Sequence, residues 1–169
     1  FDDDLISKVK ESFKEFYSER GLFDTISPNS SKIRPNQLFA ISLDFPVVET
    51  EKANEILDVV EQELITNKGI KTLSASDEDY CPRYEGDAFK RDSGYHQGTV
   101  WPFLWAYYQA ACYKLRRTPK FEINIEEMLQ DGCIGNICEI YDADEPRLAK
   151  GCVAQAWSVS MAILGEDFA

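Results

Sequence analysis

The sequence predicts an all-α fold that forms half of a double-layered helical toroid, with an inner and an outer layer of helices. Six segments are expected to be helical, and helices with one apolar face alternate with helices that are apolar on most sides. The loops that lead from the first kind into the second are long and rich in polar and aromatic residues. The loops that lead back are short, so the rich loops should all open at one end.

Helices with one apolar face are expected at 5–20, 51–66 and 125–130. Gly21 is a natural stop for the first helix, and Thr50 is expected to cap the second. The third is short and more polar. In the first helix the apolar residues have the spacing that forms one stripe: Leu5, Ile6, Val9, Phe13, Phe16 and Tyr17.

The more deeply buried helices are expected at 35–43, 99–115 and 151–164. Pro35 can open the first of them, and Pro46 prevents it from continuing. The second is apolar nearly all round, so it should be buried on most sides. We expect Thr99 to cap this helix and Pro102 to lie in its first turn.

Three long loops, 21–34, 67–98 and 131–150, connect these helices. A connection longer than about 12–15 residues without regular structure is usually functional or disordered. The middle loop is rich in aromatic residues, glycine and charges of both signs, which favours a function. The stretch from Arg91 to Pro102 ends this loop and enters the next expected helix. It brings together a cation, a carboxylate, the only histidine of the chain, a carboxamide and two aromatics. Such a concentration predicts a site.

Composition excludes several classes of partner. The 169 residues are 44% hydrophobic and suit one domain, 1–169, with a real core. The formal net charge of −12 repels phosphate backbones and anionic lipids, so we expect no nucleic acid and no membrane as partner. The sequence has no apolar run long enough to span a bilayer. Neutral polar ligands such as sugars remain open.

The cysteines favour reduced thiols in a cytoplasmic protein. None of the five forms a CxxC pair, and the chain has one histidine, so we expect neither a metal nor a cofactor. The chain begins at Phe1 and runs straight into an amphipathic helix, from which we expect a piece of a longer protein. The cysteines are Cys81, Cys112, Cys133, Cys138 and Cys152.

Five strings in order carry a resemblance to a known family. They are RPNQLFA at 34–40, GIKTLS at 69–74, RDSGYHQGTVWP at 91–102, GNICEIY at 135–141 and GCVAQAWS at 151–158. In this order the chain resembles, over nearly its whole length, the C-terminal part of the amylo-α-1,6-glucosidase domain of glycogen debranching enzymes. The family pattern has arginine more often where Lys71 stands.

The resemblance implies an (α/α)6 barrel, of which this chain would be the C-terminal half, and hydrolysis of α-1,6-linked glucose at the branch points of glycogen or limit dextrin, with inversion. Inverting glycosidases use two carboxyl groups roughly 6.5–9.5 Å apart, one as general acid and one as general base. The family's general acid lies upstream of this chain, and its general base matches Glu139. From the residues alone, Glu139 is either a base tuned by its apolar flanks or a simple surface glutamate. Asp142, Asp144 and Glu145 are expected to be solvated turn residues.

The candidate sugar-binding residues each have a structural alternative. Arg91 and Asp92 either contact the sugar or pair with each other, and His96 is either a sugar contact or a structural histidine. Trp101 is either a stacking platform or core, whereas Trp105 is expected to be core. Tyr80 and Tyr84 are packed lids or ligands. The full candidate set is Arg34, Asn36, Gln37, Arg91, Asp92, Tyr95, His96, Gln97, Trp101, Gln155 and Trp157.

Two other functions stay open. One is a non-catalytic helical module that binds oligosaccharide or a protein, and the other is a hydrolase related to glucoamylase or trehalase. Because the general acid would be missing, we expect the isolated chain to be inactive. An open half-toroid would also expose the flanks of its inner helices, which predicts a homodimer.

Overall fold

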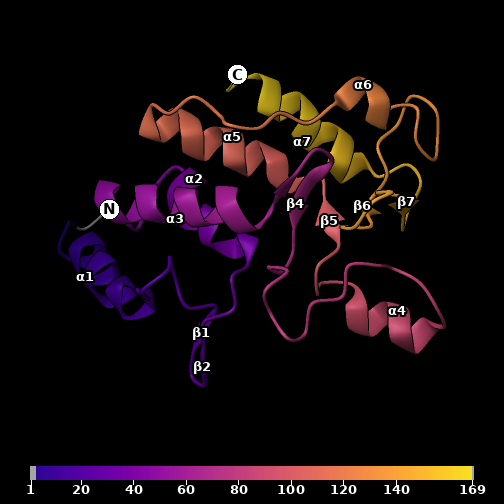
Figure 1. Ribbon diagram of the computed structural model, residues 1–169. Coiled ribbons are helices and arrows are strands. Elements are labelled where there is room, and N and C mark those ends of the chain that lie inside the picture. The colour runs from indigo at the N-terminus through magenta and orange to yellow at the C-terminus, as the bar shows by residue number, and fades with distance from the viewer. Residues whose placement is uncertain (1–2, 169) are drawn as a thin grey trace.

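The computed structural model describes residues 3–168 and has a mixed fold, so the all-α prediction is wrong (Figure 1). Helices make up 42% and strands 10% of the chain, and the strands form two antiparallel sheets of two and five strands. Phe1, on which the expectation of a longer protein rests, lies outside the described residues. Most strands lie in the three long loops, at 25–26, 29–30, 69–71, 140–141 and 149–150, whereas those at 65–66 and 100–101 lie where helices were expected.

The helical core is built around α5 (Leu104–Leu115). This helix packs against α7 (Ala156–Glu166), α3 (Thr50–Glu63) and α2 (Phe39–Ser42), which follows the 3-10 helix η2 (Pro35–Leu38). Apolar side chains of α3 and α5 are withdrawn from water and supply the main hydrophobic stabilisation. They include Ile56, Leu57, Val60, Leu104, Trp105 and Tyr108.

A buried carboxylate ties α3 to the segment after α5. Glu61, 5% exposed, accepts a hydrogen bond from the hydroxyl of Tyr108 at 3.0 Å and one from Arg117 Nη2 at 2.8 Å. The Tyr108 oxygen in turn accepts from the backbone N–H of Lys120 at 3.0 Å. A buried charge is tolerated where it is paired in this way, so the network fixes the far end of α5.

The five-stranded sheet joins parts of the chain that are far apart in sequence. Its strands are β3 (Ile65–Thr66), β4 (Gly69–Lys71), β5 (Val100–Trp101), β6 (Ile140–Tyr141) and β7 (Ala149–Lys150), paired in this order. Ile70 lies opposite Trp101, and Val100 opposite Tyr141. The sheet therefore brings the loops 67–98 and 131–150 together.

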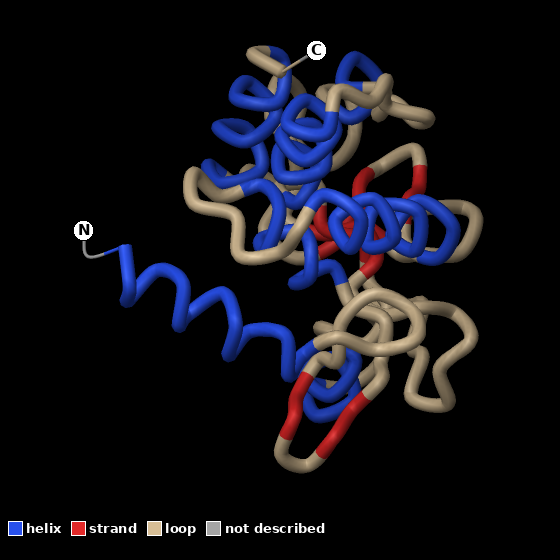
Figure 2. The backbone as a smooth tube through the Cα atoms, turned by 90° about the vertical axis from the view of Figure 1, so that its left-hand side faces the viewer, coloured by secondary structure: helices blue, strands red, loops and turns tan. Residues whose placement is uncertain are grey.

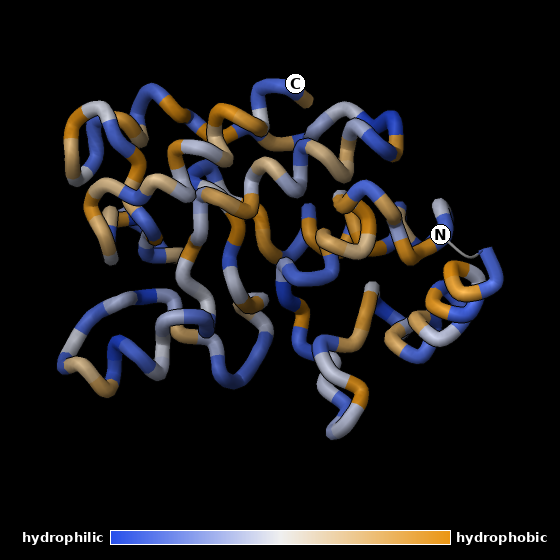
Figure 3. Tube along the Cα trace, turned by 180° about the vertical axis from the view of Figure 1, so that it is seen from behind, coloured by the Kyte–Doolittle hydropathy of each residue, from blue (hydrophilic) through white to orange (hydrophobic). Residues whose placement is uncertain are grey.

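The first part of the chain lies at the side of this body. Helix α1 (Asp3–Phe13) continues into η1 (Lys14–Phe16), and a hairpin of β1 (Thr25–Ile26) and β2 (Asn29–Ser30) follows. None of the α1 residues is buried, and the helix extends away from the rest of the chain (Figure 2). Along its turns hydrophobic and hydrophilic residues alternate (Figure 3).

The predicted helix at 99–115 begins later than expected. Val100 and Trp101 form strand β5, and the helix starts at Leu104 after Phe103. Thr99 does not cap it, because its hydroxyl donates to the carbonyl of Tyr95 at 2.6 Å. Pairing of β5 with both β4 and β6 satisfies backbone groups of residues 100 and 101, and so overrides their apolar helical pattern.

Other boundaries also differ from the prediction. Helix α4 (Ala88–Gly94) lies in a loop expected to be irregular, and Asp87 caps it by accepting from Lys90 N at 2.9 Å. Helix α6 (Ile125–Met128) is a single turn, and α3 begins at Thr50 with no side-chain cap. Helix α7 begins at residue 156 instead of 151 and is less buried than predicted, with Ile163 67% exposed.

Within the described part of the chain, no helix combines the length and the apolarity needed to cross a membrane.

Candidate functional site

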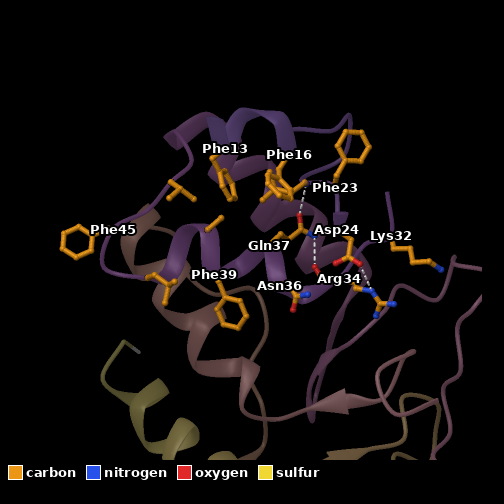
Figure 4. A pocket seen from close by; sticks show the side chains of 14 residues that line it. Phe13, Phe16, Phe23, Asp24, Lys32, Arg34, Asn36, Gln37, Phe39 and Phe45 are labelled. Carbon is orange, nitrogen blue, oxygen red and sulfur yellow. Dashed lines mark hydrogen bonds and ion pairs between the residues drawn. The ribbon is translucent and has the colours of Figure 1, made fainter. Parts of the chain in front are cut away.

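Arg34 joins the first two rich loops through its guanidinium group. Its Nε donates to Asp24 Oδ2 at 3.1 Å, as Figure 4 shows, and its Nη2 donates to Gln97 Oε1 at 2.8 Å. Its Nη1 donates to the carbonyls of Thr72 at 3.0 Å and His96 at 2.7 Å. The donors of this predicted sugar-binding residue are therefore used to hold the loops 21–34 and 67–98 together.

The second and third loops are joined by Asp142. This carboxylate is 2% exposed and accepts from the backbone N–H of Tyr84 at 2.9 Å, so the expectation of a solvated turn residue is wrong for this position. The next residue, Ala143, donates its N–H to the carbonyl of Pro82 at 2.7 Å. The three rich loops therefore meet on one side of the molecule.

Glu139 lies in the third loop with both carboxylate oxygens engaged. Its Oε2 accepts from the backbone N–H of Cys152 at 3.1 Å, and its Oε1 accepts from Gln155 Nε2 at 3.2 Å. The backbone N–H of Glu139 donates to the carbonyl of Cys152 at 2.8 Å. The side chain is partly exposed, so it can still reach a ligand.

Glu139 faces the end of α4 and the residues that follow it. Burial, followed by a hydrogen bond to Glu139, raises the pKa of Tyr95. Burial and the positive charge of Arg34 lower the pKa of His96, and the negative charge of Glu139 partly opposes them. The His96 imidazole is therefore mostly neutral at pH 7 and can both donate and accept a hydrogen bond.

An aromatic wall adjoins these groups. The His96 ring stacks on Trp101 with centroids 5.0 Å apart, and Trp157 stacks on Phe103 with centroids 3.6 Å apart. Trp101 is only 6% exposed, and its Nε1 donates to Thr99 Oγ1 at 3.1 Å. The core alternative therefore describes Trp101 better than an open platform. Trp157 is 47% exposed.

A cavity of about 200 Å³ lies against this wall. Asn36 is an exposed polar residue at its edge. Glu139 does not line this cavity, but its charge acts on His96, which does. The residues that line it include Asn36, Thr72, His96, Trp101, Phe103 and Trp157.

A larger hollow of about 290 Å³ lies on the other side of Asn36, between η1 and α2 (Figure 4). Its lining is mainly apolar, and its one carboxylate, Asp24, is paired with Arg34. Gln37 is tied to the backbone here, because its Oε1 accepts from Leu22 N at 3.3 Å and its Nε2 donates to the Arg34 carbonyl at 3.0 Å. We place the chemistry at Glu139 because this hollow lacks a free acid or base.

The remaining candidates lie on or near α4. Arg91 Nη1 donates to the carbonyl of Gly86 at 2.8 Å, and Asp92 is exposed. In residues 3–168, no ion pair links Arg91 with Asp92 and no hydrogen bond links either to Glu139. Burial raises the pKa of Tyr80 to about 12, and this ring packs so closely under Gly98 that an added Cβ would lie 2.7 Å from it.

Sequence reasoning missed some residues that shape the site. Thr72 Oγ1 accepts from Gly98 N at 2.9 Å and donates to the Thr99 carbonyl at 3.0 Å, which fixes the turn after His96. Gly151 adopts φ +67° beside the Glu139 carboxylate. Both positions lie in strings that carried the resemblance, but nothing in their residue types indicated these contacts.

Within the described residues, no group of three or more histidine, cysteine, aspartate or glutamate side chains is placed to hold a metal ion. The cysteines are free thiols. The site offers a carboxylate with hydrogen-bonding and aromatic neighbours.

Comparison with known protein families gives one match that covers nearly the whole chain. The family model described as amylo-alpha-1,6-glucosidase matches residues 3–164. This span includes Glu139, the three loops and almost all of α7, and it confirms the resemblance seen in the sequence. The chain therefore belongs to the amylo-alpha-1,6-glucosidase family and is a glycoside hydrolase-like domain related to glycogen debranching.

Proposed function

We propose that this chain is part of an enzyme that hydrolyses α-1,6-linked glucose at the branch points of glycogen or limit dextrin, with inversion and with Glu139 as the general base. The observation that carries the proposal is the position of Glu139. Its carboxylate is held by two N–H donors where the rich loops meet, beside Tyr95 and His96.

In this proposal Glu139 removes a proton from a water molecule as the water oxygen bonds to the anomeric carbon. The glycosidic C–O bond breaks on the opposite face of the sugar, and a general acid gives a proton to the departing oxygen. That acid comes from outside residues 1–169. It would lie roughly 6.5–9.5 Å from Glu139, which leaves room for the water.

The surroundings of Glu139 suit a neutral sugar. An indole packs well against the C–H groups of a pyranose, and Trp157 is 47% exposed. Asn36 and the neutral His96 line the same cavity and can hydrogen-bond to hydroxyl groups. The net charge of −12 disfavours an anionic ligand.

The full-length protein that contains this chain should release glucose from limit dextrin. Proton NMR during the first minutes should show β-glucose as the first product, since inversion converts the α-linkage. Residues 1–169 alone should release no glucose. Release of glucose by this chain alone would contradict the proposal that the general acid lies outside residues 1–169. Cleavage of α-1,4 or trehalose linkages without α-1,6 cleavage would favour a glucoamylase- or trehalase-like hydrolase.

We further propose a cytoplasmic location and a homodimer formed through exposed apolar side chains. On α7, which was expected to be an inner helix, the adjacent Ile163 and Leu164 are 67% and 41% exposed. Contiguous exposed apolar residues mark interaction surfaces in many proteins. Sedimentation analysis of the purified chain at several concentrations tests the dimer.

Replacement of Trp157 by alanine should weaken the binding of malto-oligosaccharides about 10-fold, since one stacking contact supplies on the order of 1 kcal/mol. Isothermal titration calorimetry measures this change. Tyr113→Ala is the matched control, because Tyr113 is a 65% exposed aromatic in the last turns of α5, away from the cavity-lining Leu104 at its start. If wild type and Trp157→Ala bind malto-oligosaccharides with equal affinity, the Trp157 indole does not contact the sugar.

A further inference from the structure

The carboxylate of Glu139 lies in a cradle formed by the segment 151–155. One N–H donor reaches each oxygen, from Cys152 N to Oε2 and from Gln155 Nε2 to Oε1. Gly151 closes the cradle, because a Cβ at this position would collide with Oε2 and would lie 3.2 Å from the Glu139 Cβ. Its φ of +67° also favours glycine.

Backbone hydrogen bonds hold the cradle against the strand that carries Glu139. Gln155 N donates to the Ile137 carbonyl at 2.9 Å, and Glu139 N donates to the Cys152 carbonyl at 2.8 Å. Strands β6 and β7 continue the pairing immediately after Glu139. Because both sides are fixed by the backbone, the carboxylate and the Gln155 amide have a defined separation.

The side chain of Gln155 is not used for the structural task of its position. Gln155 is the N-cap residue of α7, where Ser, Thr, Asp or Asn normally accept a hydrogen bond from the helix. Its side chain makes no capping hydrogen bond, and its amide donates to Glu139 instead. The contact is therefore directed at the carboxylate and not at the helix.

We propose that Gln155 is a positioning residue for the general base, and not a direct sugar ligand as the sequence predicted. This inference rests on the proposed function of Glu139. A carboxylate has about four lone-pair sites. The Gln155 and Cys152 donors use one site on each oxygen and the Tyr95 hydroxyl uses a third, which orients the group and leaves one site for the attacking water.

The hydrogen bond from Gln155 limits rotation of the Glu139 carboxylate, so that a lone pair of the base stays directed at the attacking water. Loss of this donor should therefore lower kcat and leave KM nearly unchanged. A residue that contacts the sugar directly would raise KM instead.

The test compares Gln155→Leu and Gln155→Glu in the full-length protein with limit dextrin as substrate. Gln155→Leu should lower kcat about 10-fold with KM changed less than about twofold, because one hydrogen bond to a charged group is lost. Gln155→Glu should lower kcat further, because it removes the donor and adds a second negative charge beside the first. Gln130→Leu is the control, since Gln130 is exposed and its amide donates to the Glu126 carbonyl within α6.

Gln155→Asn, which is one methylene too short to reach Oε1, replaces the leucine variant if that variant fails to fold by circular dichroism. A higher KM with an unchanged kcat would make Gln155 a sugar ligand and overturn the inference. Values of kcat and KM equal to those of wild type would also overturn it. These outcomes leave the proposed function intact as long as Glu139→Gln is inactive, whereas an active Glu139→Gln protein removes the proposed function itself.

Discussion

Glu139→Gln in the full-length protein should lower kcat for limit dextrin by about 10²–10⁴-fold, the range that general base catalysis supplies. The amide has almost the shape of the carboxylate, and part of it can still accept from Cys152 N or Gln155 Nε2. It cannot take a proton from the attacking water, however. KM should therefore change little, and calorimetry should find that oligosaccharide binding is retained.

Glu122→Gln is the matched control, because Glu122 is exposed and lies before α6, and the same change of charge there should leave kcat within twofold. Unchanged turnover in Glu139→Gln would defeat the assignment of the base. If the wild-type protein also bound oligosaccharide without cleaving any linkage, the chain would be a non-catalytic binding module. Loss of turnover together with loss of binding and of the thermal transition would show a folding defect, and Glu139→Ala and Glu139→Asp would then be compared.

The sequence was sufficient to place the main helices but not to predict the fold class. The approximate positions of helices α2, α3 and α5 followed from apolar periodicity and from Pro35 and Pro46, because long periodic segments carry a strong signal. The strands are two or three residues long, too short for the alternation by which strands are recognised. They form only because segments such as 69–71, 100–101 and 140–141 meet in space.

The candidate site was affected in the same way. The family resemblance predicted that residues 91–98 and Glu139 lie in the same site. The pairing of β5 with β6 is the physical reason that these segments are close. The individual roles did not follow from residue type. In the sequence alone Asp142 looks like a solvated carboxylate, although it is buried against Tyr84 N. Arg34 looks like a ligand-binding cation, although it binds loop carbonyls such as that of His96. The partners come from other loops, and no local pattern encodes them.

Arg34→Met should destabilise the protein by about 2–4 kcal/mol and lower its melting temperature by roughly 5–10 °C. Methionine keeps the apolar stem of the side chain, but the substitution removes four hydrogen bonds. The carbonyls of Thr72 and His96 are then left without this donor. The loops 21–34 and 67–98 then lose their main polar link. Differential scanning calorimetry measures the stability, and kcat/KM for limit dextrin should fall as the His96 side of the site loosens.

The only histidine of the chain gives this prediction a local readout. The charge of Arg34 is, after burial, the second cause that lowers the pKa of His96, so Arg34→Met should raise that pKa toward its ordinary value near 6.5. Because the pKa of His96 is lower in the folded state, its contribution to the free energy of unfolding is complete above about pH 6.5. This contribution is lost as the pH falls through the pKa of the folded state. The NMR titration of His96 should move to higher pH in Arg34→Met, and the stability of this variant should fall less on acidification than that of wild type.

Arg91→Met is the control, because it removes a single hydrogen bond to Gly86. It should change the free energy of unfolding by less than about 1 kcal/mol. Equal losses in the two variants would mean that Arg34 does not hold the loops together.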